Sequence, residues 1–150
     1  RDWALLKPVL RNPQAKPSPG EIAWMRDAFR DLLRIRASTP LLRLDSAAEV
    51  SRRLAFRNTG PGQNPLVVVG HLNGDGMQGA FREVLYLLNV SPAAQTLVLP
   101  AEAGKAYVLH PVHAASTAAD ARARQAGYRA RDGRIVVPGR TAVVFVVLQE

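Results

Sequence analysis

The chain has 150 residues, of which 47% are hydrophobic, so it is long enough to bury a core as a single domain. It contains no cysteine, which excludes disulfides, thiolate catalysis and cysteine-ligated zinc. The formal net charge is +8, but the 17 arginines and 3 lysines are spread over the whole chain rather than clustered, so we expect no nucleic-acid partner.

The first predicted elements are an irregular lead-in and a helix. Residues 1–17 are expected to be only partly helical, because three prolines interrupt any long helix there. Ser18-Pro19-Gly20-Glu21 then has the pattern of a capping box at a helix start. Apolar residues recur at helical spacing up to the Thr39-Pro40 step, which disfavours helix. We predict one amphipathic helix that ends near Ala37.

After Pro40 the apolar residues no longer recur at helical spacing. Short segments rich in β-branched and aliphatic residues alternate with turns that contain glycine, proline, asparagine or aspartate. The predicted strands are Val50–Arg57, Leu66–Leu72, Val84–Val90, Gln95–Leu99, Ala106–Val112, Arg134–Val137 and Thr141–Leu148. Residues 114–130 are expected to form a surface loop or a marginal helical turn. The pattern predicts a mainly β fold, an antiparallel β-sandwich of the Greek-key type preceded by one amphipathic α-helix.

The reactive residue types form no recognisable catalytic or metal-binding motif. All twelve acidic residues can be assigned to caps, the polar face of the helix, turns, loops, strand flanks or chain ends, so we expect no paired-carboxylate geometry. His110 and His113 lie three residues apart on a predicted strand, which places them on opposite faces as partly exposed positions. The glycine-rich segment 70–79 lacks the ends of a phosphate loop and the ligands of a calcium loop. We therefore expect no catalytic residue, no metal and no cofactor.

Four segments of the chain resemble a known protein family. They are Leu32–Leu44 with its Ser38-Thr39-Pro40-Leu41 turn, Phe56–Gly60, Val84–Ser91 and Val136–Phe145. In this order and spacing they resemble the C-terminal β-sandwich of bacterial pullulanase-type α-1,6-glucosidases, debranching enzymes of the α-amylase superfamily. The resemblance implies that residues 1–38 are the tail of a catalytic (β/α)8 barrel, including its last helix, and that residues 39–150 are an accessory sandwich.

The resemblance also implies a role within a longer bacterial enzyme, whether secreted, periplasmic or cytoplasmic. Such enzymes hydrolyse α-1,6 branch linkages in glucans with retention of configuration, by means of two carboxyl groups. In the family those groups belong to barrel strands that precede this sequence, so we expect no glycosidase activity from this chain. Its expected role is to pack on the catalytic barrel and stabilise it. The expected interface residues are Ile22, Met25, Phe29, Leu32 and Leu33.

Two other functions remain open on the sequence alone. An independent α-glucan-binding module would need exposed aromatic rings. Because Phe56, Tyr86 and Phe145 lie within predicted strands and are expected in the core, Tyr107 and Tyr128 are the candidate glycan contacts. The other alternative is a basic interaction domain, whose binding would weaken steeply with salt. No apolar run approaches the roughly 20 residues that cross a bilayer, so we expect no membrane partner.

Overall fold

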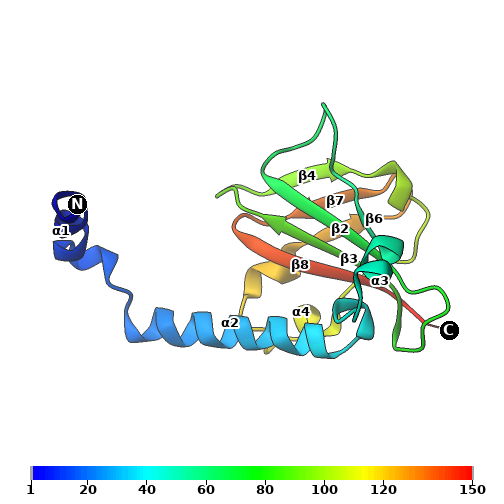
Figure 1. Ribbon diagram of the computed structural model, residues 1–150, viewed down its shortest axis with the longest axis horizontal. Helices are drawn as coiled ribbons and strands as arrows, with labels where there is room; N and C mark the ends of the chain where they lie inside the picture. Colours follow the sequence, from blue (N-terminus) through cyan, green and yellow to red (C-terminus); the bar gives the residue numbers. More distant parts are fainter. Residues whose placement is uncertain (1, 150) are drawn as a thin grey trace.

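The computed structural model describes residues 2–149 and consists of two antiparallel β-sheets approached by a long helix (Figure 1). The helices and 3-10 turns are α1 (Trp3–Arg11), η1 (Pro13–Ala15), α2 (Pro19–Ala37), η2 (Pro40–Leu42), α3 (Ala47–Arg53), η3 (Pro100–Glu102), α4 (Pro111–Ala114) and η4 (Ala121–Gln125). The strands are β1 (Leu54–Phe56), β2 (Val67–Asn73), β3 (Phe81–Asn89), β4 (Gln95–Val98), β5 (Val108–Leu109), β6 (Gly127–Arg129), β7 (Arg134–Val137) and β8 (Thr141–Leu148). One sheet has the order β1-β2-β3-β8-β5 and the other has the order β4-β7-β6. The predicted mainly β fold with a preceding helix is confirmed.

The main hydrophobic core lies between the two sheets. Alternate residues of β2, β3 and β8, such as Leu85 and Phe145, share one buried cluster with Leu97 of β4 and Ile135 of β7. Because successive residues of a strand point to opposite faces, the remaining residues of the larger sheet face away from this core. The inner face of the larger sheet is therefore buried against the smaller sheet, and its outer face can be buried only by other parts of the protein.

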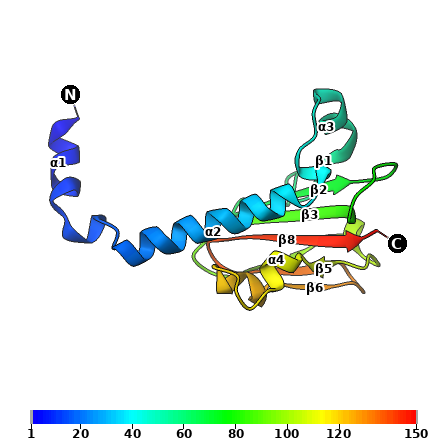
Figure 2. The same cartoon turned by 90° about the horizontal axis from the view of Figure 1, so that it is seen from below.

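The end of α2 covers part of that outer face. Ile35 of α2 and Leu41 of η2 share a second buried cluster with Leu72, Val84 and Val146 of the larger sheet. Figure 2 shows the C-terminal part of α2 running beside the sheet, while its N-terminal part and α1 extend beyond the sandwich. One end of α2 is thus anchored in the sandwich, and the other end projects from it.

The local sequence explains where α2 begins and ends. The backbone N–H of Glu21 donates to the Ser18 hydroxyl at 3.2 Å, and the Ser18 N–H donates to the Glu21 carboxylate at 2.7 Å, which completes the predicted capping box. The helix ends at Ala37, as predicted, directly before the Thr39-Pro40 step. Within residues 2–149, no helix combines the length and the apolarity that crossing a bilayer requires.

Some of the strand predictions are wrong in type. Residues 50–53 of the predicted strand Val50–Arg57 belong to the helix α3, because the Ser46 hydroxyl caps this helix by accepting from the Glu49 N–H at 3.2 Å. Only Val108–Leu109 of the segment 106–112 is strand, since Pro111 begins the short helix α4. Residues 114–130, expected to form a surface loop or a marginal helical turn, contain the 3-10 turn η4 and also the short strand β6, which was not predicted. Arg134–Val137 and Thr141–Leu148 are confirmed as strands.

Candidate functional site

One side of α2 is an apolar surface that nothing in residues 2–149 covers. The five residues expected at an interface with a barrel, Ile22, Met25, Phe29, Leu32 and Leu33, are all exposed. Phe29 keeps 58% of its surface exposed, and Met25 keeps 59%. Soluble proteins seldom leave so many large apolar side chains together in water, so this surface is a candidate interaction site.

The opposite side of α2 is fixed to the sandwich by polar contacts. The Trp24 indole N–H donates to the carbonyl of Ala119 at 3.0 Å, and the Ala119 N–H donates to the Asp31 carboxylate at 2.9 Å. The Arg122 guanidinium lies over the Trp24 ring, 5.4 Å from its centre, which is a cation–π arrangement. These contacts set the rotation of α2 about its own axis, and so hold the exposed apolar side outward.

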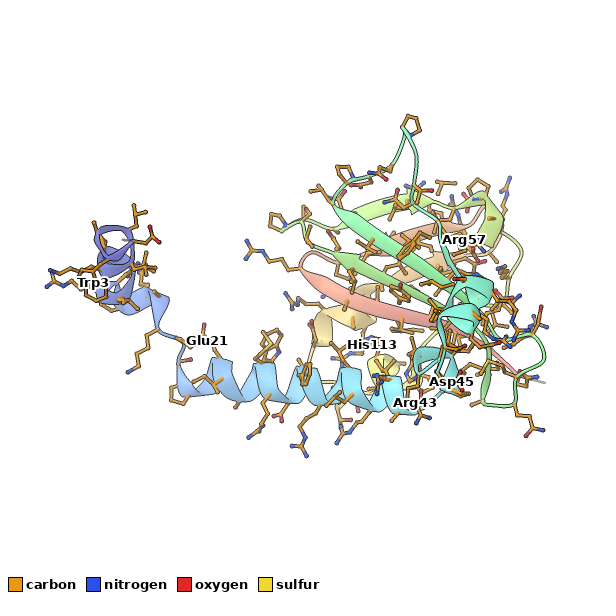
Figure 3. All side chains as sticks on the ribbon, viewed as in Figure 1. Trp3, Glu21, Arg43, Asp45, Arg57 and His113 are labelled. Carbon is orange, nitrogen blue, oxygen red and sulfur yellow. The ribbon has the colours of Figure 1, made fainter. Side chains whose placement is uncertain are left out.

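A second apolar surface lies on α1. Its large apolar residues, Trp3, Leu5, Leu6, Val9 and Leu10, are all exposed. Figure 3 shows Trp3 at the far end of the projecting part, well away from the sheets, with Glu21 at the start of α2 between the two. The lead-in is partly helical as predicted, since it consists of α1 and the short turn η1, but Pro8 lies inside α1 and does not interrupt it. An amphipathic helix that contacts no sheet is typical of a segment whose partner lies outside residues 2–149.

The two histidines of the segment 110–113 join α2 to the sandwich. Their predicted exposure on a strand is wrong, because both are buried, His110 as the N-cap of α4 and His113 within that helix. The Val112 N–H donates to His110 Nδ1 at 3.2 Å, which leaves Nε2 as the protonated nitrogen. This Nε2–H donates to the Ser38 hydroxyl at 3.0 Å, and that hydroxyl donates to the carbonyl of Ile35 at 2.7 Å. The C-terminal end of α2 is thereby locked in place.

A buried cluster of charged groups lies between the sheets at one end. Glu102 is completely buried, and its carboxylate accepts from Lys105 Nζ at 2.7 Å and from the Tyr107 hydroxyl at 2.8 Å. Glu83 accepts from the same two groups, at 2.7 Å and 3.0 Å, and is joined to His71 Nε2 at 2.8 Å. The structure therefore brings two carboxylates together, contrary to the expectation that no carboxylate pair could be assembled.

Comparisons with known proteins place this architecture in a family. Residues 1–147 match the family of C-terminal domains of pullulanase-type α-1,6-glucosidases. The chain belongs to this family. It is 35% identical over 154 aligned residues to the chloroplastic pullulanase 1 of Arabidopsis thaliana, an alignment that covers 97% of this chain and 16% of the relative.

Solved structures agree with this assignment. An apo pullulanase of Klebsiella pneumoniae superimposes with a TM-score of 0.79 at 25% identity, over 89% of this chain and 15% of that one. A pullulanase of Paenibacillus barengoltzii in complex with maltotriose shares the fold with a TM-score of 0.59 at 24% identity, over 80% of this chain and 16% of that one. This pullulanase-type domain therefore spans less than a fifth of the length of each relative.

The structure corrects the expected surroundings of the aromatic residues in this pullulanase-type domain. Tyr107 was a candidate for exposure, but it keeps only 7% of its surface exposed. Tyr128 is half-buried, donates its hydroxyl to the carbonyls of Glu102 at 2.6 Å and Lys105 at 3.0 Å, and packs edge-on against Tyr107. Phe56, which was expected in the core, is exposed, whereas Phe145 is buried as expected. Glycan contact by either tyrosine stays a prediction.

The carboxylate pair of this domain has the wrong electrostatics for an acid catalyst. Burial by itself raises the pKa of Glu83, but hydrogen bonds from Lys105 and His71 hold that pKa below its usual value. Burial likewise raises the pKa of Glu102, and hydrogen bonds from Lys105 and Tyr107 outweigh it, so this pKa is also lowered. A general acid in glycoside hydrolysis needs a raised pKa. The pair is therefore suited to holding the sandwich together.

The same cluster contains three side chains of the type that binds metals. Ligand atoms of His71, Glu83 and Glu102 lie within 4.8 Å of one another. However, the Lys105 ammonium hydrogen-bonds both carboxylates and lies 3.3 Å from His71 Nε2. A divalent cation there would face the positive charge of Lys105, so these residues do not fit a metal centre.

Sequence reasoning missed the residues that orient α2. The sequence pattern predicts Asp31 on the polar, solvent-facing side of the helix and assigns no contact to Trp24. Both lie on the side of α2 that faces the sandwich, where Asp31 is buried. Their spacing of seven residues, two helical turns, is the signal that could have placed them together on one side.

Proposed function

We propose that this chain is the non-catalytic C-terminal part of a pullulanase-type debranching enzyme, that α1 and α2 pack against the rest of its catalytic barrel, and that the accessory sandwich packs on this barrel and stabilises it. In this proposal residues 1–38 are the tail of the barrel and residues 39–150 are the accessory sandwich. The observation that carries the proposal is the exposure of Ile22, Met25, Phe29 and Leu33 on a helix that is rigidly attached at its other end. The relatives support it, because this chain spans only 16% of the Arabidopsis pullulanase.

The energetics of burial favour a stabilising role for the exposed side of α2. Each large apolar side chain that moves from water into an interface contributes roughly 1.5 to 3 kcal/mol before entropy is subtracted. Several such side chains together are large against the net stability of about 5 to 15 kcal/mol of a typical domain. The chemistry of the proposed enzyme, hydrolysis of α-1,6 linkages in glucans with retention, belongs to the barrel.

The test truncates the proposed interface in the longer enzyme. Phe29→Ala or Leu33→Ala should each lower the stability by about 2 to 5 kcal/mol, the range for deleting a large buried apolar side chain. Differential scanning calorimetry should show a lower melting temperature, while kcat/KM on pullulan and amylopectin stays close to that of the parent. Val98→Ala is the matched control, because Val98 is an exposed apolar residue of β4 on the other sheet.

Two outcomes would contradict the proposed role. An unchanged melting temperature together with altered substrate preference would show that α2 acts on the substrate rather than on stability. Retention of the enzyme on amylopectin that Tyr128→Ala abolishes, with stability unaffected, would favour the alternative of a glycan-binding module.

A further inference from the structure

The smaller sheet has an edge strand, β4, on whose outer side no other strand lies within residues 2–149. The strand order β4-β7-β6 places β4 at the end of the sheet, and Figure 1 shows it on the side of the sandwich away from α2. The Leu99 N–H donates to the carbonyl of Gly133 at 3.0 Å, on the side of β7. Because peptide groups alternate in direction along an antiparallel strand, those of Thr96 and Val98 point away from β7. This edge therefore offers two N–H donors and two carbonyl acceptors.

Strand β4 also lacks the features with which native edge strands prevent pairing. It reads Gln95-Thr96-Leu97-Val98, without lysine, proline or any charged side chain, and its register with β7 is continuous. Leu97 points into the core and keeps 7% of its surface exposed, whereas Val98, on the other face, keeps 55%. An added strand would therefore extend both the buried face and the exposed face of the smaller sheet.

The open edge of β4 lines a cleft of about 380 Å³. The other wall of this cleft is the loop that follows β1, with Asn58, Thr59, Gln63 and Asn64. The Asn58 side chain fixes the loop, because it donates to the carbonyl of Asn64 at 2.7 Å and accepts from the Asn64 N–H at 2.9 Å. The Asn64 side chain in turn donates to the side chain of Gln95 at 3.0 Å, which joins the loop to the start of β4. The cleft is therefore preformed, as ligand-binding clefts usually are.

The cleft offers neutral groups to an occupant. Among the described residues that line it, Arg57 alone carries a charge, and none is aromatic. The Arg57 guanidinium donates to the carboxylate of Glu102 at 2.5 Å and lies 2.9 Å from His71 Nδ1, so its charge is already compensated. An uncharged occupant that forms hydrogen bonds with main-chain groups fits this lining, whereas a glucan would find no ring on which to stack.

We propose that β4 binds an extended, uncharged peptide segment of a second protein by strand addition, in the cleft between the β4 edge and the loop. The main chain of the segment pairs with Thr96 and Val98, and its side chains alternate between the buried face beside Leu97 and the exposed face beside Val98. A folded second copy fits less well, because the loop wall leaves room beside β4 for a single chain. The segment is assigned to a separate protein because the barrel is proposed to lie on the α2 side, away from this edge. The inference thus goes beyond the proposed function and uses a different surface.

The test measures binding of a short peptide to the longer enzyme. The probe is a fluorescein-labelled, amidated peptide of alternating threonine and valine, followed by fluorescence polarisation. We expect a dissociation constant on the order of 100 µM, because one short strand supplies few hydrogen bonds. Hydrogen exchange of the β4 segment should slow when the probe binds, because the N–H groups of Thr96 and Val98 become hydrogen-bonded.

The variant Val98→Pro removes one donor from the open edge. This N–H does not pair with β7, and proline is tolerated on the outer side of an edge strand, so the enzyme should still fold. We expect Val98→Pro to weaken probe binding at least about tenfold, and the matched control Val98→Ala, which keeps the N–H, to change it by less than about threefold. A probe whose alternate amides are N-methylated should bind as weakly to the parent enzyme, which tests the pairing without any change in the protein.

Several results would overturn the inference. One is equal binding of the probe by Val98→Pro and the parent, or equal binding of the methylated and unmethylated probes. Another is the absence of saturable binding up to about 1 mM probe. Displacement of the probe by maltotriose would assign the cleft to a glucan, and self-association of the parent that Val98→Pro abolishes would assign it to a second copy. None of these results affects the proposed function, which Phe29→Ala and Leu33→Ala test separately.

Discussion

The residues that matter most inside this domain are polar ones buried among apolar neighbours. Glu83, Glu102, Lys105 and Tyr107 form one hydrogen-bonded group, in which Lys105 supplies positive charge to both carboxylates. A charge in such a place is tolerated only with its partners, since removing one partner leaves another buried charge uncompensated. The sequence placed these acidic residues in loops and at strand flanks, because their pairing depends on contacts between elements that no local pattern encodes.

Replacing Lys105 should therefore be costly. We expect Lys105→Met to lower the free energy of unfolding by about 3 kcal/mol at neutral pH, because both carboxylates lose the cation that they share and only Glu102 keeps a second one, the Arg57 guanidinium. Urea unfolding followed by circular dichroism measures this change. Lys16→Met, at an exposed lysine, is the control and should change stability by less than about 0.5 kcal/mol. Equal stabilities of the two variants would show that the cluster does not hold the sandwich together.

His110 should make the folded state sensitive to mild acid. Burial, with nearby His113 as a smaller cause, lowers the pKa of His110 from 6.5 to about 4. In the unfolded chain the imidazole of His110 takes up a proton near pH 6.5, whereas in the folded protein it stays neutral until about pH 4. The neutral, buried imidazole therefore adds fully to the stability of the fold above pH 6.5, and this stability is lost progressively as the pH falls towards 4. We expect unfolding free energies measured across this range to fall less steeply in His110→Gln than in the parent. If the unfolding free energies of His110→Gln and of the parent fell in parallel with pH, His110 would not be the group that makes the fold sensitive to acid.

At the scale of elements, the sequence predicted those helix boundaries and strands that residues close together in the chain determine. The capping box of α2, its end at the Thr39-Pro40 step, and the strands β7 and β8 were all predicted from nearby residues. The type of α3 was missed although Ser46 and Glu49 carry the same cap pattern, because the aliphatic residues that follow suggested a strand. Strand β6 is short and gains its place only by pairing with β7, which is a tertiary contact.

The turn between β6 and β7 provides a test at this scale. Gly133 has a φ of +65°, and an added Cβ would lie 2.1 Å from the carbonyl oxygen of Leu99. We expect Gly133→Ala to destabilise the fold by about 1 to 3 kcal/mol, because the backbone must leave the left-handed region and move apart. Gly62→Ala is the control, since an added Cβ there meets no atom within 4 Å and the backbone is not left-handed. Thermal unfolding that is the same for both variants would contradict this view of the turn.

At the scale of the whole molecule, the distribution of apolar surface is uneven. The space between the two sheets is closed by a well-packed core, while α1, the outward side of α2 and half of the outer sheet face are apolar and open. The helical spacing of apolar residues predicted that α2 is amphipathic, and the resemblance to the family implied that its apolar side faces a partner. The sequence did not predict the open half of the outer sheet face, around Val68 and Leu88, because that exposure depends on where α2 and η2 stop covering this face.

The central claim is that the catalytic region covers the outward side of α2. The most direct measurement is an experimental structure of the longer enzyme, from which the exposed fraction of Phe29 is calculated. The account predicts that this fraction falls from 58% to below about a tenth, with side chains of the barrel in contact with the ring. A structure in which Phe29 stays as exposed as it is in this chain would contradict the account.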